Sequence, residues 1–209
     1  ALVQTSRRAF STGGSMKNAA IVVCALAWLL MAPAQAEPRE FVIDEEHFSI
    51  GFLINHIGYA DQLGQFLEGS GRFVWDESAN ELQSGEVVVK AASVFTNHRE
   101  RDRHLRSEDF FNSSEFEEIR FTAQQWVPGG DSSGTLHGSL SMLGQSHPVS
   151  LDITINRRAA YPFGHERYTV GMSARTTLKR SQWGMTYAVE DGLVGDEVRM
   201  LLEFEAIAQ

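Results

Sequence analysis

The sequence predicts an all-β protein, an antiparallel barrel of about eight strands with one or two short helices. Three observations support this prediction. Apolar and polar residues alternate along most of the chain, which is the period of a half-buried strand. Turn-forming residues separate these runs at short intervals, as they do between antiparallel neighbours. A closed barrel is the simplest arrangement that leaves no strand edge unpaired.

The strand-like runs follow one another from residue 71 to the C-terminus. In EFEEIRFTAQQWV, Ile119 and Phe121 fall on one face and Arg120 falls on the other. In DEVRMLLEFEAI, every second position from Val198 to Phe204 is apolar. The predicted strand runs are residues 71–76, 85–94, 115–127, 134–143, 148–156, 167–178 and 196–207. The main turn signals are residues 76–80, 128–130, 143–144 and 191–192.

The main predicted helix lies in TNHRERDRHLRSEDFF, residues 96–111. Asn97 is placed to cap it, with Glu100 as the capping-box partner three residues later. Leu105 is the only aliphatic residue between positions 97 and 107, so the segment cannot be a core helix. We therefore expect a short surface helix across one end of the barrel, with Leu105 and the Phe110–Phe111 pair inserting into the body.

The first 36 residues predict export. Residues 16–36 have a short basic start, an apolar run and the small-x-small pattern Ala34-Gln35-Ala36, so we expect a secretory signal cleaved after Ala36. Residues 1–15 are assigned to an upstream extension. Their SRRAF stretch resembles a twin-arginine signal, which leaves both export routes open. The mature chain, residues 37–209, is expected in the periplasm as one domain.

Charge and cysteine content exclude several kinds of site in that mature chain. Cys24 is the only cysteine and lies in the signal, so disulfides, thiolate metal ligands and thiol nucleophiles are excluded after cleavage. Residues 1–36 carry three basic side chains and no acidic one, so 15 basic and 27 acidic residues remain, a formal charge of −12. Such a chain is a poor candidate for nucleic-acid binding, and no nucleic-acid partner is expected.

An ordered set of short motifs runs from Phe41 to the C-terminus and resembles the YceI-like family of periplasmic polyisoprenoid-binding proteins. The segment with the most specific pattern is Arg-Asp-x-His-Leu-Arg-Ser-x-Asp-Phe-Phe at residues 101–111. One departure is Phe48, which stands where the family often has Ser directly after the first His. The residues at the family's opening positions are Asp44, His47, Phe52, His56, Gly64, Phe66 and Gly71. Later pieces that fit are IRFTAQQW, LHGSLSMLGQSHPVSLDI and KRSQWGM.

The resemblance implies an extended, lipocalin-like antiparallel barrel of about eight strands. Its long apolar interior would hold, without covalent attachment, an isoprenoid, a quinone-like molecule or another long-chain lipid for transport, storage or sequestration. No catalysis and no other cofactor are implied. Thirteen Phe and six Met can supply an adaptable lining. The expected lining residues are Phe52, Phe66, Phe110, Phe111, Phe121, Trp183, Met200 and Leu202.

The polar cluster on the predicted helix has two interpretations. Arg101, His104 and Arg106 could clamp a diphosphate or carboxylate head group at the barrel mouth. Alternatively they fix the helix by hydrogen bonds and ion pairs, with Asp102 neutralising one arginine. Both interpretations place the cluster at one barrel end.

The sequence gives less support to an enzyme or to a metal-binding protein. There is no Gly-x-Ser-x-Gly elbow, and paired carboxylates such as Glu117–Glu118 are typical of solvated faces, so we expect no catalytic residues. His98, His104 and Asp102 could ligate a metal only if they converged with further ligands, so no metal is expected. The alternatives kept open are a histidine-cluster metal or stress-response protein, a quinone-delivery partner of a membrane redox complex, and a homodimer.

Overall fold

The computed structural model describes residues 37–209. The predicted signal, its cleavage site and residues 1–15 lie outside the described residues. The strands are β1 (Arg39–His56), β2 (Ala60–Phe66), β3 (Gly69–Asp76), β4 (Glu81–Lys90), β5 (Val94–Phe95), β6 (Glu118–Gly130), β7 (Ser133–Met142), β8 (Gln145–Ala160), β9 (Tyr168–Lys179) and β10 (Val194–Ala208). The helices are the 3₁₀ turns η1 (Ala91–Ser93) and η2 (Arg180–Trp183) and the α-helix α2 (Arg99–Leu105).

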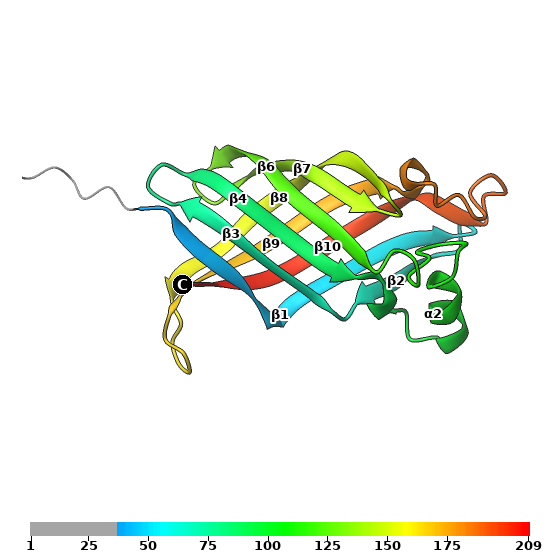
Figure 1. Cartoon of the computed structure of the whole chain (residues 1–209), viewed down its shortest axis with the longest axis horizontal. Coiled ribbons are helices and arrows are strands. Elements are labelled where there is room, and N and C mark those ends of the chain that lie inside the picture. Colours follow the sequence, from blue (N-terminus) through cyan, green and yellow to red (C-terminus); the bar gives the residue numbers. More distant parts are fainter. Residues whose placement is uncertain (1–36) are drawn as a thin grey trace, which may run out of the picture. The chain divides into compact units, whose positions relative to one another are not determined.

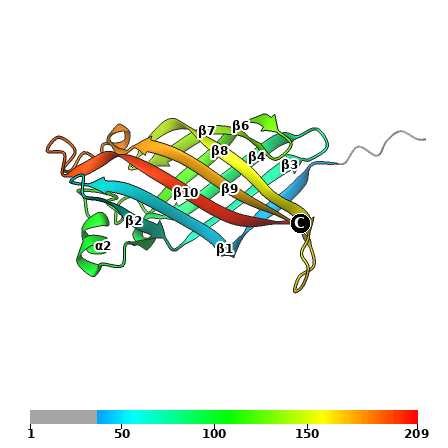
Figure 2. The ribbon, with the colours of Figure 1, turned by 180° about the vertical axis from the view of Figure 1, so that it is seen from behind.

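All pairings in the sheet are antiparallel, and the pairing of β10 with β1 closes it into a barrel (Figures 1 and 2). β3 pairs with the first part of β1, and β2 pairs with the last part of β1. Both strands run antiparallel to β1. They therefore occupy one position in the barrel wall, and the wall has eight strand positions. The predicted eight-stranded antiparallel barrel with short helices is confirmed.

Alternation along the strands decides which side chains enter the barrel. The face of β6 that carries Ile119 and Phe121 lines the interior, as predicted, and Phe121 is buried. At the end of the barrel that holds the C-terminus, Phe41 is fully buried, stacks on Phe73 at 5.1 Å between ring centroids, and lies beside Trp75. This end is closed by packed side chains.

β1 changes its partner at a wide bulge. Ile43 pairs with Ala206 and Phe48 with Phe204, so four residues of β1 lie opposite one residue of β10. Asp44 holds the bulge: its carboxylate accepts from the backbone N–H of Glu46 at 3.1 Å and lies 2.7 Å from His47 Nδ1. Such bulges bend a strand, and here the bend allows β1 to pair first with β3 and then with β2.

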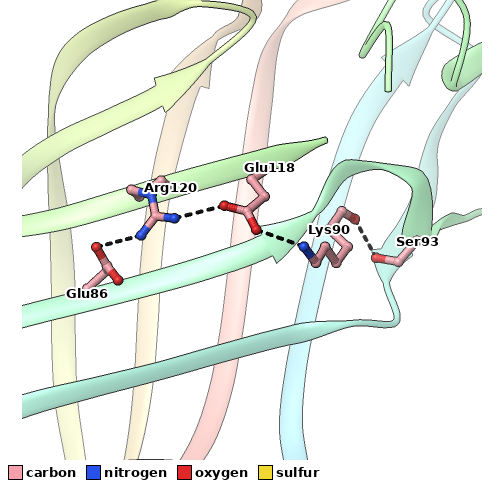
Figure 3. A network of polar contacts seen from close by, with 5 residues as sticks. All are labelled: Glu86, Lys90, Ser93, Glu118 and Arg120. Atoms are coloured by element: carbon pink, nitrogen blue, oxygen red, sulfur yellow. Dashed lines mark hydrogen bonds and ion pairs between the residues drawn. The ribbon is translucent and has the colours of Figure 1, made fainter. Parts of the chain in front are cut away.

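The outer face of the wall carries a polar network across β4 and β6 (Figure 3). Arg120 bridges Glu86 at 2.6 Å and Glu118 at 2.8 Å, and Lys90 reaches Glu118 at 2.7 Å. The hydrogen bond from Lys90 lowers the pKa of the Glu118 carboxyl. These side chains are solvated, so the network adds little stability and mainly keeps the outer face polar.

α2 lies at the other end of the barrel, where the surface helix was expected (Figure 1). The predicted cap at Asn97 is wrong. The N-cap is His98, whose Nδ1 accepts the Arg101 N–H at 3.2 Å, while Asn97 turns the chain at a φ of 58°. None of the helices within residues 37–209 has the length and apolar character needed to cross a bilayer.

Phe41→Ala should lower the free energy of unfolding by about 3–5 kcal/mol, because it empties a fully buried ring site that cannot collapse easily. Urea denaturation monitored by circular dichroism would measure the loss. Val42→Ala, at an exposed neighbouring position, serves as the control and should change stability by less than about 1 kcal/mol.

The bulge should make stability depend on pH. The hydrogen bond with Asp44 raises the pKa of His47, and the same bond lowers the pKa of Asp44. The pair therefore stabilises the fold above the lowered pKa of Asp44 and below the raised pKa of His47. His47→Gln should cost stability near pH 5 but not near pH 9, by less than about 1 kcal/mol because the pair is partly solvated. Equal losses at both pH values, in parallel urea titrations, would contradict this account.

Candidate functional site

The barrel holds a cavity of about 380 Å³ at the α2 end. Seven of the eight apolar residues expected to line a ligand lie on its wall: Phe52, Phe66, Phe110, Phe111, Phe121, Met200 and Leu202. Trp183 does not. It is buried behind the wall, where its Nε1–H donates to the Leu140 carbonyl at 3.0 Å, and its neighbour Met185 faces the cavity instead.

The closure of the barrel supplies much of the wall. Three successive cross-strand pairs of β1 and β10 line the cavity: Ile50 with Leu202, Phe52 with Met200, and Ile54 with Val198. Because side chains alternate along both strands, the residues between these pairs face outward. The register of the β1–β10 pairing therefore places a continuous strip of apolar side chains in the interior.

Two cavity aromatics rest on glycines of a neighbouring strand. A Cβ atom on Gly64 would lie 2.1 Å from Phe52 Cζ, and one on Gly138 would lie 2.4 Å from Phe121 Cζ. Neither glycine could be replaced without moving the ring above it. Each ring thus occupies the space above a glycine that a side chain would otherwise fill.

A second cavity of about 100 Å³ lies beyond the first, inside the same barrel. Its walls include Phe48, Phe73, Trp75 and Trp126. Four residues line both cavities: Val87, Phe121, Leu151 and Leu202. We call these four the waist. The two apolar cavities are thus neighbours in the barrel, with the waist as their common wall.

Arg101 is the expected head-group residue with the most direct place at the cavity. Its Nε donates to Thr96 Oγ1 at 2.7 Å, Nη1 to Gln62 Oε1 at 3.0 Å and Nη2 to the Thr96 carbonyl at 2.7 Å. These acceptors are neutral. Asp102 does not neutralise an arginine as expected, because its buried carboxylate accepts from the Thr96 N–H at 2.7 Å and the Thr96 hydroxyl at 2.5 Å.

His104 and Arg106 have different positions. His104 lines the cavity, with Nε2 at 2.8 Å from Asp109 Oδ2 and its ring edge-on to Phe110. Arg106 is not on the wall. Its guanidinium donates to the carbonyls of Ala92 at 2.6 Å and Val94 at 2.8 Å, so it ties the end of α2 to the preceding segment.

Arg180 is a site residue for which the sequence analysis assigned no role, although KRSQWGM was noted as fitting. Its side chain is buried beside the cavity and donates to four carbonyls at 2.8–3.1 Å. Burial lowers the pKa of the guanidinium. The accepting residues all lie around the connection from η2 to β10: Met185, Tyr187, Val194 and Gly195. Arg180 therefore fixes the loop that borders the cavity mouth.

The histidines of α2 do not converge on a common point. His98 caps the helix, His104 contacts Asp109, and Asp102 faces Thr96. Within residues 37–209, the side chains close enough to share a metal ion are Asp44, His47 and Glu205, at the β1 bulge and away from the cavity. Exposed groups of this kind also occur without an ion, and these have a structural role in the bulge.

A profile described as the YceI-like domain matches residues 41–206. The chain belongs to the YceI-like family. A UPF0312 protein of Pseudomonas putida is 34% identical over 163 residues, which cover 77% of this chain and 84% of the relative. The family resemblance drawn from the sequence motifs is thereby confirmed.

Solved structures of other proteins show the same fold. The Campylobacter jejuni YCEI protein has a TM-score of 0.67 and 24% identity, covering 74% of this chain and 89% of its own. A polyisoprenoid binding domain from Saccharophagus degradans has a TM-score of 0.58 and 13% identity, covering 83% of this chain and all of its own. At these identities the likeness establishes the fold.

Arg180→Met should destabilise the YceI-like barrel by about 2–4 kcal/mol, because one buried and three part-buried hydrogen bonds to carbonyls are lost. In this variant, the loop around Tyr187 should exchange its amide hydrogens faster than in the wild type, while exchange in the strands changes less. Hydrogen-exchange mass spectrometry would measure this. Arg175→Met, at a partly exposed arginine of β9, is the control and should leave the loop protected. Uniform acceleration over the whole barrel would contradict a local anchoring role.

Proposed function

We propose that this protein holds a polyisoprenoid or another long-chain lipid, including quinone-like and fatty-chain molecules, inside its barrel and catalyses no reaction. The observation that carries the proposal is the larger cavity, lined mostly by apolar side chains, with a smaller apolar cavity beside it in the same barrel. The volume of the larger cavity falls in the usual range for ligand pockets, roughly 300–1,000 Å³, and suits a lipid tail. The fold neighbour from Saccharophagus degradans described as a polyisoprenoid binding domain supports the same class of ligand.

Burial of an apolar tail supplies the binding energy. Each CH₂ group moved from water into such a wall contributes about 0.8 kcal/mol. Flexible and aromatic side chains, such as Met200 and Phe111, can adapt to tails of different shape. Part of a prenyl chain is therefore enough for firm binding.

The polar groups on the wall favour holding over chemistry. Arg180 commits four of its five N–H donors to carbonyls, and His104 is engaged by Asp109. Arg101 commits three of its five N–H donors, and it forms no ion pair with a carboxylate of residues 37–209. Two donors remain for the oxygen atoms of a ligand head group. We assign Arg101 and His104 to the binding of the head group and Arg106 to a structural role.

The site of action follows from the N-terminal signal. Residues 16–36 support export of the mature chain to the periplasm, where a water-insoluble lipid needs a protein to cross the aqueous space. Transport, storage and sequestration all use the same cavity. The proposed function is the binding step that they share.

Native mass spectrometry tests the proposal directly. The chain from Glu37 to Gln209 would be purified from periplasm without detergent and its bound material extracted into organic solvent. A co-purifying mass that extracts as a prenyl or long-chain lipid is the expected result. A bare protein mass, with no uptake of added octaprenol, would mean that the interior does not serve as a lipid site.

Head-group recognition predicts unequal losses. Arg101→Ala should weaken the binding of a prenyl diphosphate at least tenfold more than that of the matching prenyl alcohol, because the diphosphate loses a charged donor. Arg106→Ala is the control, since Arg106 is off the wall, and it should affect both lipids alike. Equal losses for both lipids in Arg101→Ala would remove the head-group assignment. Tryptophan fluorescence titration measures both affinities.

The waist predicts a dependence on chain length. A tail that crosses the waist should be blocked by Leu151→Trp, so tails long enough to reach the second cavity lose contacts there. Exclusion of two CH₂ groups costs about 1.6 kcal/mol, or more than tenfold in affinity for octaprenol, while geranylgeraniol should be affected less. Leu178→Trp, on the wall of the larger cavity alone, should weaken both lipids and is the control.

A further inference from the structure

The cavity mouth is bordered by two adjacent loops that expose apolar side chains. They are the β1–β2 turn (57–59) and the loop between η2 and β10 (184–193), and the Ile57 N–H donates to the Leu193 carbonyl at 3.1 Å. The residues next to the β1–β2 turn and in the second loop line the cavity, through His56 and Tyr187. Figure 1 shows both loops at the end of the barrel that carries α2.

Large apolar side chains are concentrated there. Of nine exposed large apolar residues in the described chain, four lie on these two loops. Tyr59 is 89% exposed, and the other three are between 44% and 47% exposed. We call these four the apolar rim: Ile57, Tyr59, Tyr187 and Leu193.

Ile57 is held in an unfavourable backbone conformation. Its φ is 53°, Gly58 follows at 73°, and the Tyr59 N–H closes the turn on the His56 carbonyl at 3.0 Å. A β-branched residue at positive φ is a genuine outlier, and Asn is the usual residue at the first position of such a turn. The strain is not offset by full burial, because 45% of Ile57 is exposed. An exposed, strained apolar residue beside a cavity mouth indicates a surface that has a use.

We propose that the apolar rim inserts into the interface of a lipid bilayer, so that the cavity mouth opens toward the membrane when lipid is exchanged. This inference rests on the proposed function. A long-chain lipid resides in a bilayer, and a mouth pressed against that surface shields the tail from water during transfer. Tyrosine prefers the level of the lipid head groups, and Ile and Leu enter the acyl boundary.

The charges around the rim define the kind of surface it fits. Glu190 and Asp191 are exposed on the same loop as Leu193. On α2, the exposed Arg99 and Arg103 both lie against Glu100. The mouth end therefore has no unbalanced basic patch to attract anionic lipids. Binding is apolar in origin, to a zwitterionic surface, and insensitive to salt.

Vesicle flotation tests the inference. The mature protein should float with phosphatidylcholine vesicles, and equally at about 0.1 M and about 1 M salt. Combining Tyr59→Ser with Leu193→Ser should reduce the bound fraction at least tenfold. The matched control combines Val127→Ser with Phe163→Ser, which removes two exposed apolar residues from the opposite end and should leave binding unchanged. A wild-type protein that does not float, binding that salt abolishes, or an equal loss in the control would overturn the inference.

Ile57→Asn separates membrane contact from folding. Asn accepts the positive φ, so this variant should melt at the same or a higher temperature than the wild type while it binds vesicles less. A lower melting temperature, or unchanged vesicle binding, would count against the role of Ile57.

Lipid uptake distinguishes this inference from the proposed function. Octaprenol would be supplied either in phosphatidylcholine vesicles or from ethanol, and uptake followed by native mass spectrometry. The double variant at Tyr59 and Leu193 should load at least tenfold more slowly from vesicles and at the wild-type rate from ethanol. Equal rates from vesicles would overturn the rim alone. If the wild type takes up octaprenol by neither route, the proposed function fails and the rim inference fails with it.

Discussion

The pairing of β1 with β10 is the constraint on which the rest of the structure depends. It joins the two ends of the described chain and closes the sheet into a barrel. It also fixes which side chains of both strands face inward, and so it creates the apolar strip of the cavity. The bulge at Asp44 belongs to the same constraint, because β1 could not pair with β10 on one side and with β3 and β2 on the other without bending.

Buried and half-buried arginines organise the open end, where strand pairing stops. Arg106 and Arg180 donate to backbone carbonyls at strand ends and in the loops beside them, and Arg101 does so in part. A guanidinium with five donors in a fixed plane suits this task, because one side chain can satisfy several carbonyls at once. The cavity mouth is thereby kept in shape without cysteine cross-links. Arg101 combines this role with two spare donors and a place on the cavity wall, whereas Arg180, also on the wall, keeps one.

The strands could be predicted from the sequence because alternation is a local signal that burial on one face enforces. The eight-stranded barrel and the inward face of β6 followed from it, and the surface helix followed from a polar segment with one aliphatic residue. Side-chain partners could not be predicted in this way. Asn97 and His98 are both able to cap a helix, and only the backbone turn at Asn97 decides between them. The alternation of apolar and polar residues also does not show that β2 and β3 share one position in the barrel wall.

The site residues show the same division. Seven of the apolar lining positions followed from the family resemblance together with inward alternation, and ligand contact at each of them remains a prediction. Trp183 lies in a 3₁₀ turn, where no alternation tells which way a side chain points. Arg106 and Arg180 look alike in sequence, as basic residues in polar segments. Their contacts depend on carbonyls distant in the chain, which no local pattern reveals.

The positions of the tryptophans give the mature chain a built-in optical probe. Residues 37–209 contain three: Trp75 and Trp126 line the second cavity, and Trp183 packs behind the wall of the first. Indole emission responds to the polarity and packing around the ring. A lipid tail that stops short of the waist leaves the surroundings of Trp75 and Trp126 unchanged, whereas a longer one touches both rings. The depth that a tail reaches can therefore be followed without an added label.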